Sequence, residues 1–375
     1  MAPLPLPSPT ASAAKYIGAG VIWSFWGGNP PDLVLRCIQS IKQNNPGRPV
    51  IVVDQDTIQN FLEPSDFPIY GNGQRGEPSS FSCVQYLSDW VRLTLLEKYG
   101  GVWLDASCIA TNSVDEWVRN QHQVTLFPMH ANPNIHGNWA IGSPTPGHPV
   151  IRAWRDEIAA VYRDIKPGDI PTEYCKQTLS SFPEINELWS FPSPPPLPYL
   201  WPYLAFQVAL HRYPDLRRQI DLIPSNNGPM YRRYLFNPNG APDDSVSEKT
   251  AHHLATKLPC RERHDRYFIK LVGKDRAPVQ QYLNSETYSV GSVIHDLSRT
   301  APRPISYGVD LHNHVLQMEG DIDRLCLWAA TTLKKRNTKK KPGRDKSKKA
   351  GAGYVPIPCP LSIACSERAV SAGAA

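Results

Sequence analysis

The sequence predicts an α/β fold with a Rossmann-like, mostly parallel sheet flanked by helices. Apolar segments rich in β-branched and aromatic residues at 16–28, 49–54 and 102–105 have the pattern of buried strands. Amphipathic segments with helical spacing lie between them, and the order strand, helix, strand at this spacing indicates a βαβ unit with parallel strands. With 375 residues, of which 41% are hydrophobic, the chain can bury a sizeable core.

The first βαβ unit spans residues 16–54. Its first strand, "YIGAGVIWSFWGG", ends at two glycines, where a tight turn is easy because glycine has no Cβ. The helix that follows Pro31 stops at "NPG" (45–47), and "PVIVVD" (49–54) is the second strand. The apolar residues of this helix recur at helical spacing: Leu33, Val34, Cys37, Ile38 and Ile41.

A second helix, beginning near Ser79, leads into the third strand. Asp89 and Arg92 lie off its apolar stripe, and Gly100 or Gly101 supplies a left-handed cap before "VWLD" (102–105). The rest of the pattern predicts a strand and a Pro/Gly turn within 138–148, a helix through 151–161, a helix at 203–213, short strands within 219–224 and 266–272, and a helix at 315–333.

Outside this domain, at 16–300, the composition changes. Residues 1–15 form a Pro/Ala/Ser leader that we expect to be disordered, 301–333 a linker with a candidate helix, and 334–375 a basic disordered tail. Ten Lys or Arg and one Asp between 334 and 349 give that segment a formal charge of +9, so the remainder of this +6 chain carries −3. A basic run in a tail does not make a nucleic-acid-binding face, so we expect no nucleic-acid partner and at most weak contact with acidic surfaces.

The cysteines and the apolar segments indicate neither a zinc site nor a membrane span. The eight cysteines include no CxxC pair. No apolar run reaches about 18 residues, and "MAPLPLPSPTASAAK" lacks a basic start followed by an apolar stretch. The expected location is therefore cytoplasmic, and the sequence does not predict an oligomeric state.

Asp105 stands where a binding site is expected. In open parallel sheets, ligands bind beyond the carboxyl ends of the strands, at the point where the strand order reverses. Asp105 ends the third strand, and the segment Trp23 to Trp26 ends the first. An aspartate at a strand's end also serves as an ordinary turn or cap residue, so its neighbours must decide between the two roles.

Four segments together resemble one known family. "IWSFWGG" (22–28), "SDWVR" (88–92), "KYGGVWLDAS" (98–107) and "NWAIGSPTPGHPVI" (138–151) are similar to the capsular polysaccharide synthesis type of sugar transferase. That type is related to the DXD-containing glycosyltransferases, which include initiating mannosyltransferases and large glucosylating toxins. The resemblance covers roughly 16–165, and "FIKLVGK" (268–274) is similar to a weaker lysine-containing motif of the family.

The resemblance implies a GT-A fold, with a nucleotide-sugar half at about 16–165 and an acceptor half at about 166–300. It implies that Trp23 packs against the nucleotide base and that Asp89 and Arg92 contact the donor. Asp105 would be the catalytic and metal-binding first acid of the DXD motif, with Mn²⁺ or Mg²⁺ as cofactor. Ser107 would lie at the motif's third position and contact the donor, although serine is a poorer metal ligand than aspartate.

Each of these residues also has an ordinary structural role. Trp23 could be a core aromatic residue, and Asp89 with Arg92 could form a surface ion pair. His136 and Asn138 could face the acceptor or close a turn, and Lys270 could neutralise the diphosphate or mark a strand edge. His252 and His253 are metal candidates only because histidines can act as ligands.

The resemblance predicts an enzyme that transfers a sugar from a nucleotide-sugar donor to a hydroxyl of a glycan or glycolipid, with retention of the anomeric configuration. Two alternatives stay open. Ser107 suggests a catalytically weakened relative that binds a nucleotide-sugar or a glycan without turnover. The basic tail suggests a nucleic-acid-associated protein.

Overall fold

The computed structural model describes residues 20–129, 132–189, 199–223, 245–257, 267–303 and 305. These all lie in the first of two compact units of the chain, Met1–Glu319; the second unit, Gly320–Ala375, lies outside the described residues. The predicted leader at 1–15, the helix at 315–333 and the tail at 334–375 also lie outside them.

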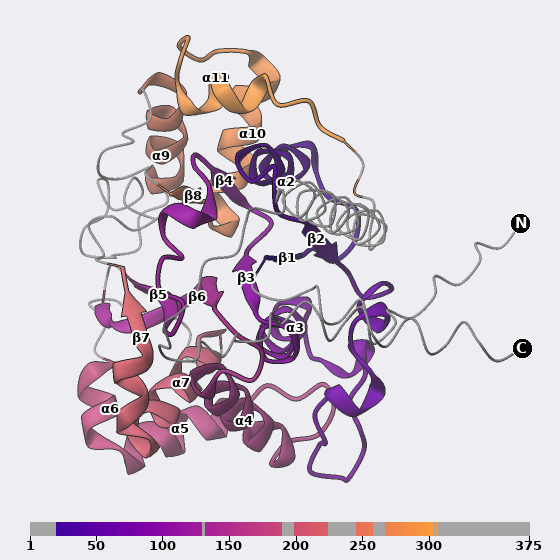
Figure 1. The fold of residues 1–375 in the computed structure, drawn as a ribbon, viewed down its shortest axis with the longest axis vertical. Helices are drawn as coiled ribbons and strands as arrows, with labels where there is room; N and C mark the ends of the chain where they lie inside the picture. The colour runs from indigo at the N-terminus through magenta and orange to yellow at the C-terminus, as the bar shows by residue number, and fades with distance from the viewer. Residues whose placement is uncertain are drawn as a thin grey trace, which may run out of the picture. The chain divides into compact units, whose positions relative to one another are not determined.

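A six-stranded mixed sheet forms the centre of the described domain (Figure 1). Its strand order is β2-β1-β3-β6-β5-β7. The pairs β1–β2, β1–β3 and β5–β7 are parallel, whereas β6 is antiparallel to both β3 and β5, so β6 runs against the other five. The mostly parallel sheet predicted from the sequence is therefore confirmed. The strands are β1 (Ile22–Phe25), β2 (Val50–Val53), β3 (Gly101–Leu104), β5 (Val124–Met129), β6 (Asn132–Ser143) and β7 (Ile220–Leu222).

Helices cover both faces of the sheet, because side chains alternate between the faces along each strand. Trp23 of β1 and Trp103 of β3 lie in the same core as α3, α4 and α7. Ile22 and Val102 face the opposite side, together with Ile41 of α2. The helices are α2 (Asp32–Asn44), α3 (Val84–Tyr99), α4 (Pro149–Arg163), α5 (Thr172–Ser181), α6 (Pro183–Leu188), α7 (Trp201–Arg212), α9 (Ser245–Thr256), α10 (Arg276–Ser285) and α11 (Val293–Ser298).

A two-stranded antiparallel ribbon lies beside the sheet, next to α2 and α10 (Figure 1). It pairs β4 (Cys108–Ala110) with β8 (Phe268–Lys270), and Lys270 is the register partner of Cys108. The short strand predicted within 266–272 is confirmed, whereas the sequence analysis did not predict β4 or β5. The ribbon joins two segments that lie about 160 residues apart in the sequence.

The helix predicted from near Ser79 begins later, at Val84, after a 3₁₀ turn at Pro78–Ser80. It ends at Gly100, whose φ is 69°, and Gly101 follows with φ 94°. A Cβ on Gly101 would lie 2.5 Å from the carbonyl oxygen of Val21, so only glycine permits the close approach of β3 to β1. In the described part of the chain, no helix has the length and apolar character needed to cross a membrane.

Candidate active site

The turn Asp105–Ser107 connects β3 of the main sheet to β4 of the ribbon. The amide N–H of Asp105 donates to the carbonyl of Trp139 on β6 (2.9 Å), and the amide N–H of Cys108 donates back to the carbonyl of Asp105 (3.0 Å). Because side chains alternate along a strand, Asp105 faces the same side as Trp103, which is the side covered by α3. The turn therefore directs the Asp105 carboxylate toward that helix.

The Asp105 carboxylate accepts hydrogen bonds from three side chains. Its Oδ1 accepts from Arg92 Nη2 (3.0 Å) and from Trp103 Nε1 (2.8 Å), and its Oδ2 accepts from Lys270 Nζ (2.7 Å). Lys270 also donates to Ser107 Oγ (2.9 Å), and the Ser107 hydroxyl donates in turn to the carbonyl of Leu271 (3.0 Å). A helix, a strand and the ribbon thus converge on one carboxylate.

Asp89 extends this network across α3. Its Oδ1 accepts from Arg92 Nη1 (2.7 Å) and from Asn138 Nδ2 (2.8 Å). The amide oxygen of Asn138 accepts from the hydroxyl of Tyr203 on α7 (2.7 Å). We call the whole set the Asp105 cluster; it consists of Asp89, Arg92, Trp103, Asp105, Ser107, Asn138, Tyr203 and Lys270.

The charges of the cluster balance at neutral pH, with two carboxylates, one guanidinium and one ammonium. Burial raises the pKa of Asp105, but Lys270 and Arg92 outweigh burial and hold that pKa below its ordinary value. Burial lowers the pKa of Lys270, but the Asp105 carboxylate outweighs burial and raises that pKa above its ordinary value. The ammonium therefore stays charged. The side chain of Asp105 is 24% exposed, against 4% for Arg92, 12% for Lys270 and 14% for Asp89, so Asp105 is the charged member most open to solvent.

Six of the eight candidate residues from the sequence come together in this cluster: Asp89, Arg92, Asp105, Ser107, Asn138 and Lys270. Their roles toward a substrate stay predictions. The alternative of a plain surface ion pair for Asp89 and Arg92 is wrong, because the guanidinium is nearly fully buried and bridges two carboxylates. The strand-edge alternative for Lys270 does not fit either, since its ammonium points inward to Asp105.

Trp23 and His136 are not part of the cluster. Trp23 is fully buried; its indole N–H donates to the carbonyl of Gly100 (3.0 Å), and its ring packs against Phe61 and Tyr99. No face of this ring is left for a nucleotide base, so the donor contact expected for Trp23 is corrected to a core role.

His136 lies on β6 and contacts α7 instead of Asp105. Its Nδ1 lies 3.3 Å from the Nε2 of Gln207, and its ring packs edge-on against Phe206. Burial lowers its pKa to about 4, so the imidazole is neutral at physiological pH. The predicted acceptor contact of His136 is replaced by packing against α7.

Two members of the cluster, Trp103 and Tyr203, were not predicted from the sequence. Trp103 lies two residues before Asp105 on the same strand, and the period-two rule of strands could have indicated that the two side chains share a face. Tyr203 is 65 residues from Asn138, and no local pattern marks the contact between them.

The residues of the cluster do not fit a resident divalent cation. The Asp105 Oδ1 already accepts two hydrogen bonds, and the Lys270 ammonium lies between Asp105 Oδ2 and Ser107 Oγ, the two groups that the DXD motif would offer to a metal. The balanced charge also leaves no excess negative charge to attract one. Metal coordination by Asp105 stays a prediction from the family resemblance, and this arrangement of hydrogen bonds argues against it.

Metal-ligating side chains do not gather elsewhere in the described ranges. Nowhere in them do three or more His, Cys, Asp or Glu residues lie close enough together to hold a metal ion. Of the two histidines named from the sequence, His252 hydrogen-bonds through its Nδ1 to the hydroxyl of Tyr282 (3.0 Å), and His253 lies on the same helix, α9.

Asp89 is expected to give the cluster a pH-dependent effect on stability. Burial, opposed by Arg92, raises its pKa from 3.8 to about 6. Between pH 3.8 and about 6 the folded protein holds a proton on Asp89 that the unfolded chain has lost. The contribution of Asp89 to the free energy of unfolding is therefore fully present below about pH 3.8 and is lost as the pH rises through about 6. The melting temperature of the wild type, relative to Asp89→Asn, is therefore expected to be higher at pH 5 than at pH 7.5.

The comparison with Asp89→Asn is needed because His136 changes the stability over nearly the same pH range and in the opposite direction. Its pKa falls from 6.5 to about 4, so its contribution to stability grows as pH rises through that range. His136 is present in both proteins and its contribution cancels in the difference. An equal difference in melting temperature at both pH values would contradict the raised pKa of Asp89.

Comparison with known proteins yields one family and several distant similarities. Residues 8–167 match the family described as capsular polysaccharide synthesis protein. A curated relative, the O-glycosyltransferase braB of Annulohypoxylon truncatum, is 24% identical over 152 residues, which cover 36% of this chain and 35% of the relative. The chain therefore matches only about a third of that protein's length.

Two solved structures are similar to this chain, with low TM-scores and low sequence identity. The PaToxG glycosyltransferase has a TM-score of 0.28 and 14% identity over 56% of this chain and 91% of its own. The galactosyltransferase LgtC, solved in complex with donor and acceptor sugar analogues, has a TM-score of 0.31 and 10% identity over 61% of this chain and 82% of its own. The similarity to a family rests on the sequence match alone, in which residues 8–167 of this chain match the family described as capsular polysaccharide synthesis protein.

Proposed function

We propose that this chain is a glycosyltransferase that moves a sugar from a nucleotide-sugar donor to a hydroxyl of a glycan or glycolipid acceptor. The observation that carries the proposal is the Asp105 cluster, in which two cations meet one partly exposed carboxylate at the carboxyl end of β3. This is the edge of the sheet where ligands of α/β folds bind. The family match over residues 8–167, which includes Asp89, Arg92 and Asp105, supports the same proposal.

The reaction requires stabilisation of a leaving group. The bond between the anomeric carbon and the diphosphate oxygen breaks, a new bond forms from that carbon to the acceptor oxygen, and the acceptor hydroxyl gives its proton to the departing diphosphate. Negative charge then builds up on the diphosphate, and fixed positive charges that are already in place lower the energy of that state. Lys270 and Arg92 provide such charges, and Asp105 holds both in position.

Other members of the cluster would orient the two substrates. In this proposal Asp105 and Ser107 lie next to the donor sugar and its diphosphate, and Asp89 holds Arg92 from the other side. Asn138 connects Asp89 to Tyr203 on α7, which belongs to the half of the domain that we assign to the acceptor. Retention of the anomeric configuration stays a prediction from the family resemblance.

One observation favours a second candidate function, that of a binding protein without turnover. Every polar group of the Asp105 carboxylate is already engaged, and Ser107 supplies no second carboxylate. Calorimetric titration with several nucleotide-sugars, run beside a donor-hydrolysis assay, separates the candidates, because a binding protein gives heat without product. The nucleic-acid alternative concerned residues 334–349, which lie outside the described residues, and we do not propose it.

A screen of nucleotide-sugar donors tests the proposed function. With the full chain, we expect hydrolysis or transfer from one donor to exceed that from the others by about tenfold or more, because a nucleotide site discriminates through specific hydrogen bonds. Release of the nucleoside diphosphate, measured by a coupled assay, gives the readout. Absence of both binding and turnover for every donor and metal condition would contradict the proposal.

A further inference from the structure

The ammonium group of Lys270 lies where the two ends of a DXD motif would hold a metal ion. It donates to Asp105 Oδ2 at 2.7 Å and to Ser107 Oγ at 2.9 Å. Resting on the proposed function, we propose that Lys270 takes the place of a resident divalent cation and is the charge that meets the donor's diphosphate. The chain then binds its donor without added metal.

The ribbon fixes Lys270 in this position. Lys270 pairs in register with Cys108, directly after the turn that carries Asp105 and Ser107. A lysine on a two-stranded ribbon normally points into solvent. This side chain is only 12% exposed, and its contact with Asp105 spans 165 residues of sequence. Its inward position is therefore a feature of the fold and not of local sequence.

Ser107 is suited to an ammonium partner and not to a metal. Its hydroxyl hydrogen is used toward the carbonyl of Leu271, which leaves the oxygen lone pairs to accept from Lys270. An aspartate at this position would place a carboxylate against the Leu271 carbonyl with no hydrogen to donate, and both groups are acceptors. A serine in place of the second aspartate of the DXD motif is therefore consistent with the inward position of Lys270.

The Lys270 ammonium also has an N–H donor left for a phosphate oxygen. An ammonium has three N–H donors, and Lys270 directs them at two acceptors within the described part of the chain. Asp105, beside it, is the most exposed charged member of the cluster. A diphosphate that approaches from this open side can accept from Lys270 while Asp105 and Ser107 keep it in place. Charge-assisted hydrogen bonds of this kind are the strong ones in proteins.

Calorimetric titration of UDP and GDP into the full chain tests the proposal. Each titration is run in EDTA and again in Mn²⁺, with the wild type, Lys270→Met, Lys270→Arg and the control Lys176→Met. Met keeps the length of the side chain and removes its charge, and Arg keeps the charge. Lys176 is an exposed lysine on α5 whose partner, Glu173, lies 3.8 Å away. Circular dichroism and a melting curve establish that each variant is folded.

We expect one of the two nucleotides to bind the wild type in EDTA with an affinity within about threefold of that in Mn²⁺. Lys270→Met should weaken that binding by about tenfold or more, the size of a lost charge-assisted hydrogen bond, while Lys270→Arg restores part of it and Lys176→Met leaves it unchanged. Restoration by arginine separates a contact with the ligand from a purely structural role. Mn²⁺ titrated into the nucleotide-free wild type should give no binding heat.

Three results would overturn the inference, and they can be told apart. Binding of a nucleoside diphosphate in Mn²⁺ but not in EDTA would show that the site needs a metal, and the proposed glycosyltransferase function would stand. No binding of either nucleotide in any condition would remove the inference together with the nucleotide-sugar site. Unchanged affinity in a folded Lys270→Met protein would also overturn the role of this lysine.

Discussion

Replacing Asp105 by asparagine is expected to lower donor turnover by about 100-fold or more in a protein that still folds. The carboxylate accepts from Arg92, Trp103 and Lys270, and among the described residues it is the group that contacts both cations at the proposed diphosphate site. An asparagine has nearly the same shape, but it carries no charge and offers an N–H₂ group where one of these donors needs an acceptor. Displacing preorganised charges by a small distance is enough for a loss of this size.

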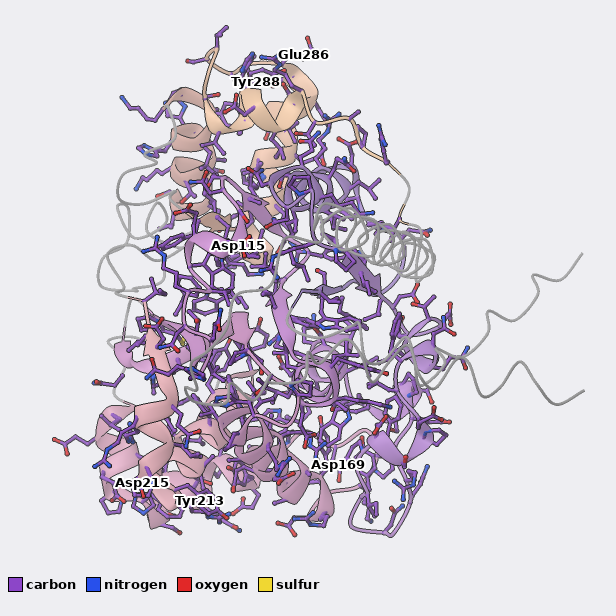
Figure 2. The ribbon with its side chains drawn as sticks, in the orientation of Figure 1. Asp115, Asp169, Tyr213, Asp215, Glu286 and Tyr288 are labelled. Atoms are coloured by element: carbon purple, nitrogen blue, oxygen red, sulfur yellow. The ribbon has the colours of Figure 1, made fainter. Side chains whose placement is uncertain are left out.

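The turnover of Asp105→Asn is measured by release of the nucleoside diphosphate, with circular dichroism and a melting curve as evidence of folding. Asp215→Asn is the matched control. Asp215, labelled in Figure 2, lies in the 3₁₀ helix Pro214–Gln219, and its side chain is 89% exposed with Arg218 at 3.7 Å. Such an exposed pair contributes little, so the control should behave as wild type. Wild-type turnover in a folded Asp105→Asn protein would remove Asp105 from the proposed mechanism.

The largest effect on stability is expected for Arg92→Met. The guanidinium is 4% exposed and joins Asp89 to Asp105, so its removal leaves two largely buried carboxylates without their common partner. Loss of one partner of a buried ion pair typically costs about 3–5 kcal/mol of unfolding free energy. Urea unfolding of the two proteins at pH 7.5 measures the difference.

Two further variants separate the charge effect from loss of packing in Arg92→Met. The double variant Arg92→Met/Asp89→Asn should recover part of the lost stability, because it also removes one of the uncompensated charges. Arg218→Met changes an arginine that is 87% exposed and should leave the unfolding midpoint within about 0.5 kcal/mol of wild type. A double variant that is no more stable than Arg92→Met would mean that the cost came from packing against Trp103, over whose ring the guanidinium lies.

The sequence predicts the sheet well where strand and helix patterns are strong. β1, α2, β2 and β3 are long enough, and their apolar residues regular enough, for the local pattern to identify them. β4 has only three residues directly after a turn, and its pairing with β8 depends on a segment about 160 residues away, so local propensity carries no sign of it. Its absence from the sequence prediction therefore has a physical cause.

The same limit applies to the candidate site. Asp89, Arg92 and Asp105 could be placed together because a helix and the following strand put them close in the chain. The meeting of Lys270 with Asp105 could not, since tertiary pairing alone brings them together. Trp23 shows the opposite error: its place in a motif suggested a ligand contact, but the alternation along β1 turns its ring into the core. Motif position indicates which residues are near a site, whereas the face of the strand decides which of them reach it.

The ribbon also has a consequence for the order of events during synthesis. Chains emerge from the ribosome at about 5–20 residues per second and fold from the N-terminus onward. The 165 residues that separate Asp105 from Lys270 therefore correspond to roughly ten to thirty seconds. Throughout that interval the nascent chain can form the first strands of the sheet. Asp105 can then pair with Arg92 but not yet with Lys270. The nascent chain thus carries a net negative charge at the Asp105 cluster until β8 has been synthesised, and the charges of the cluster balance only when the last part of the domain has been made.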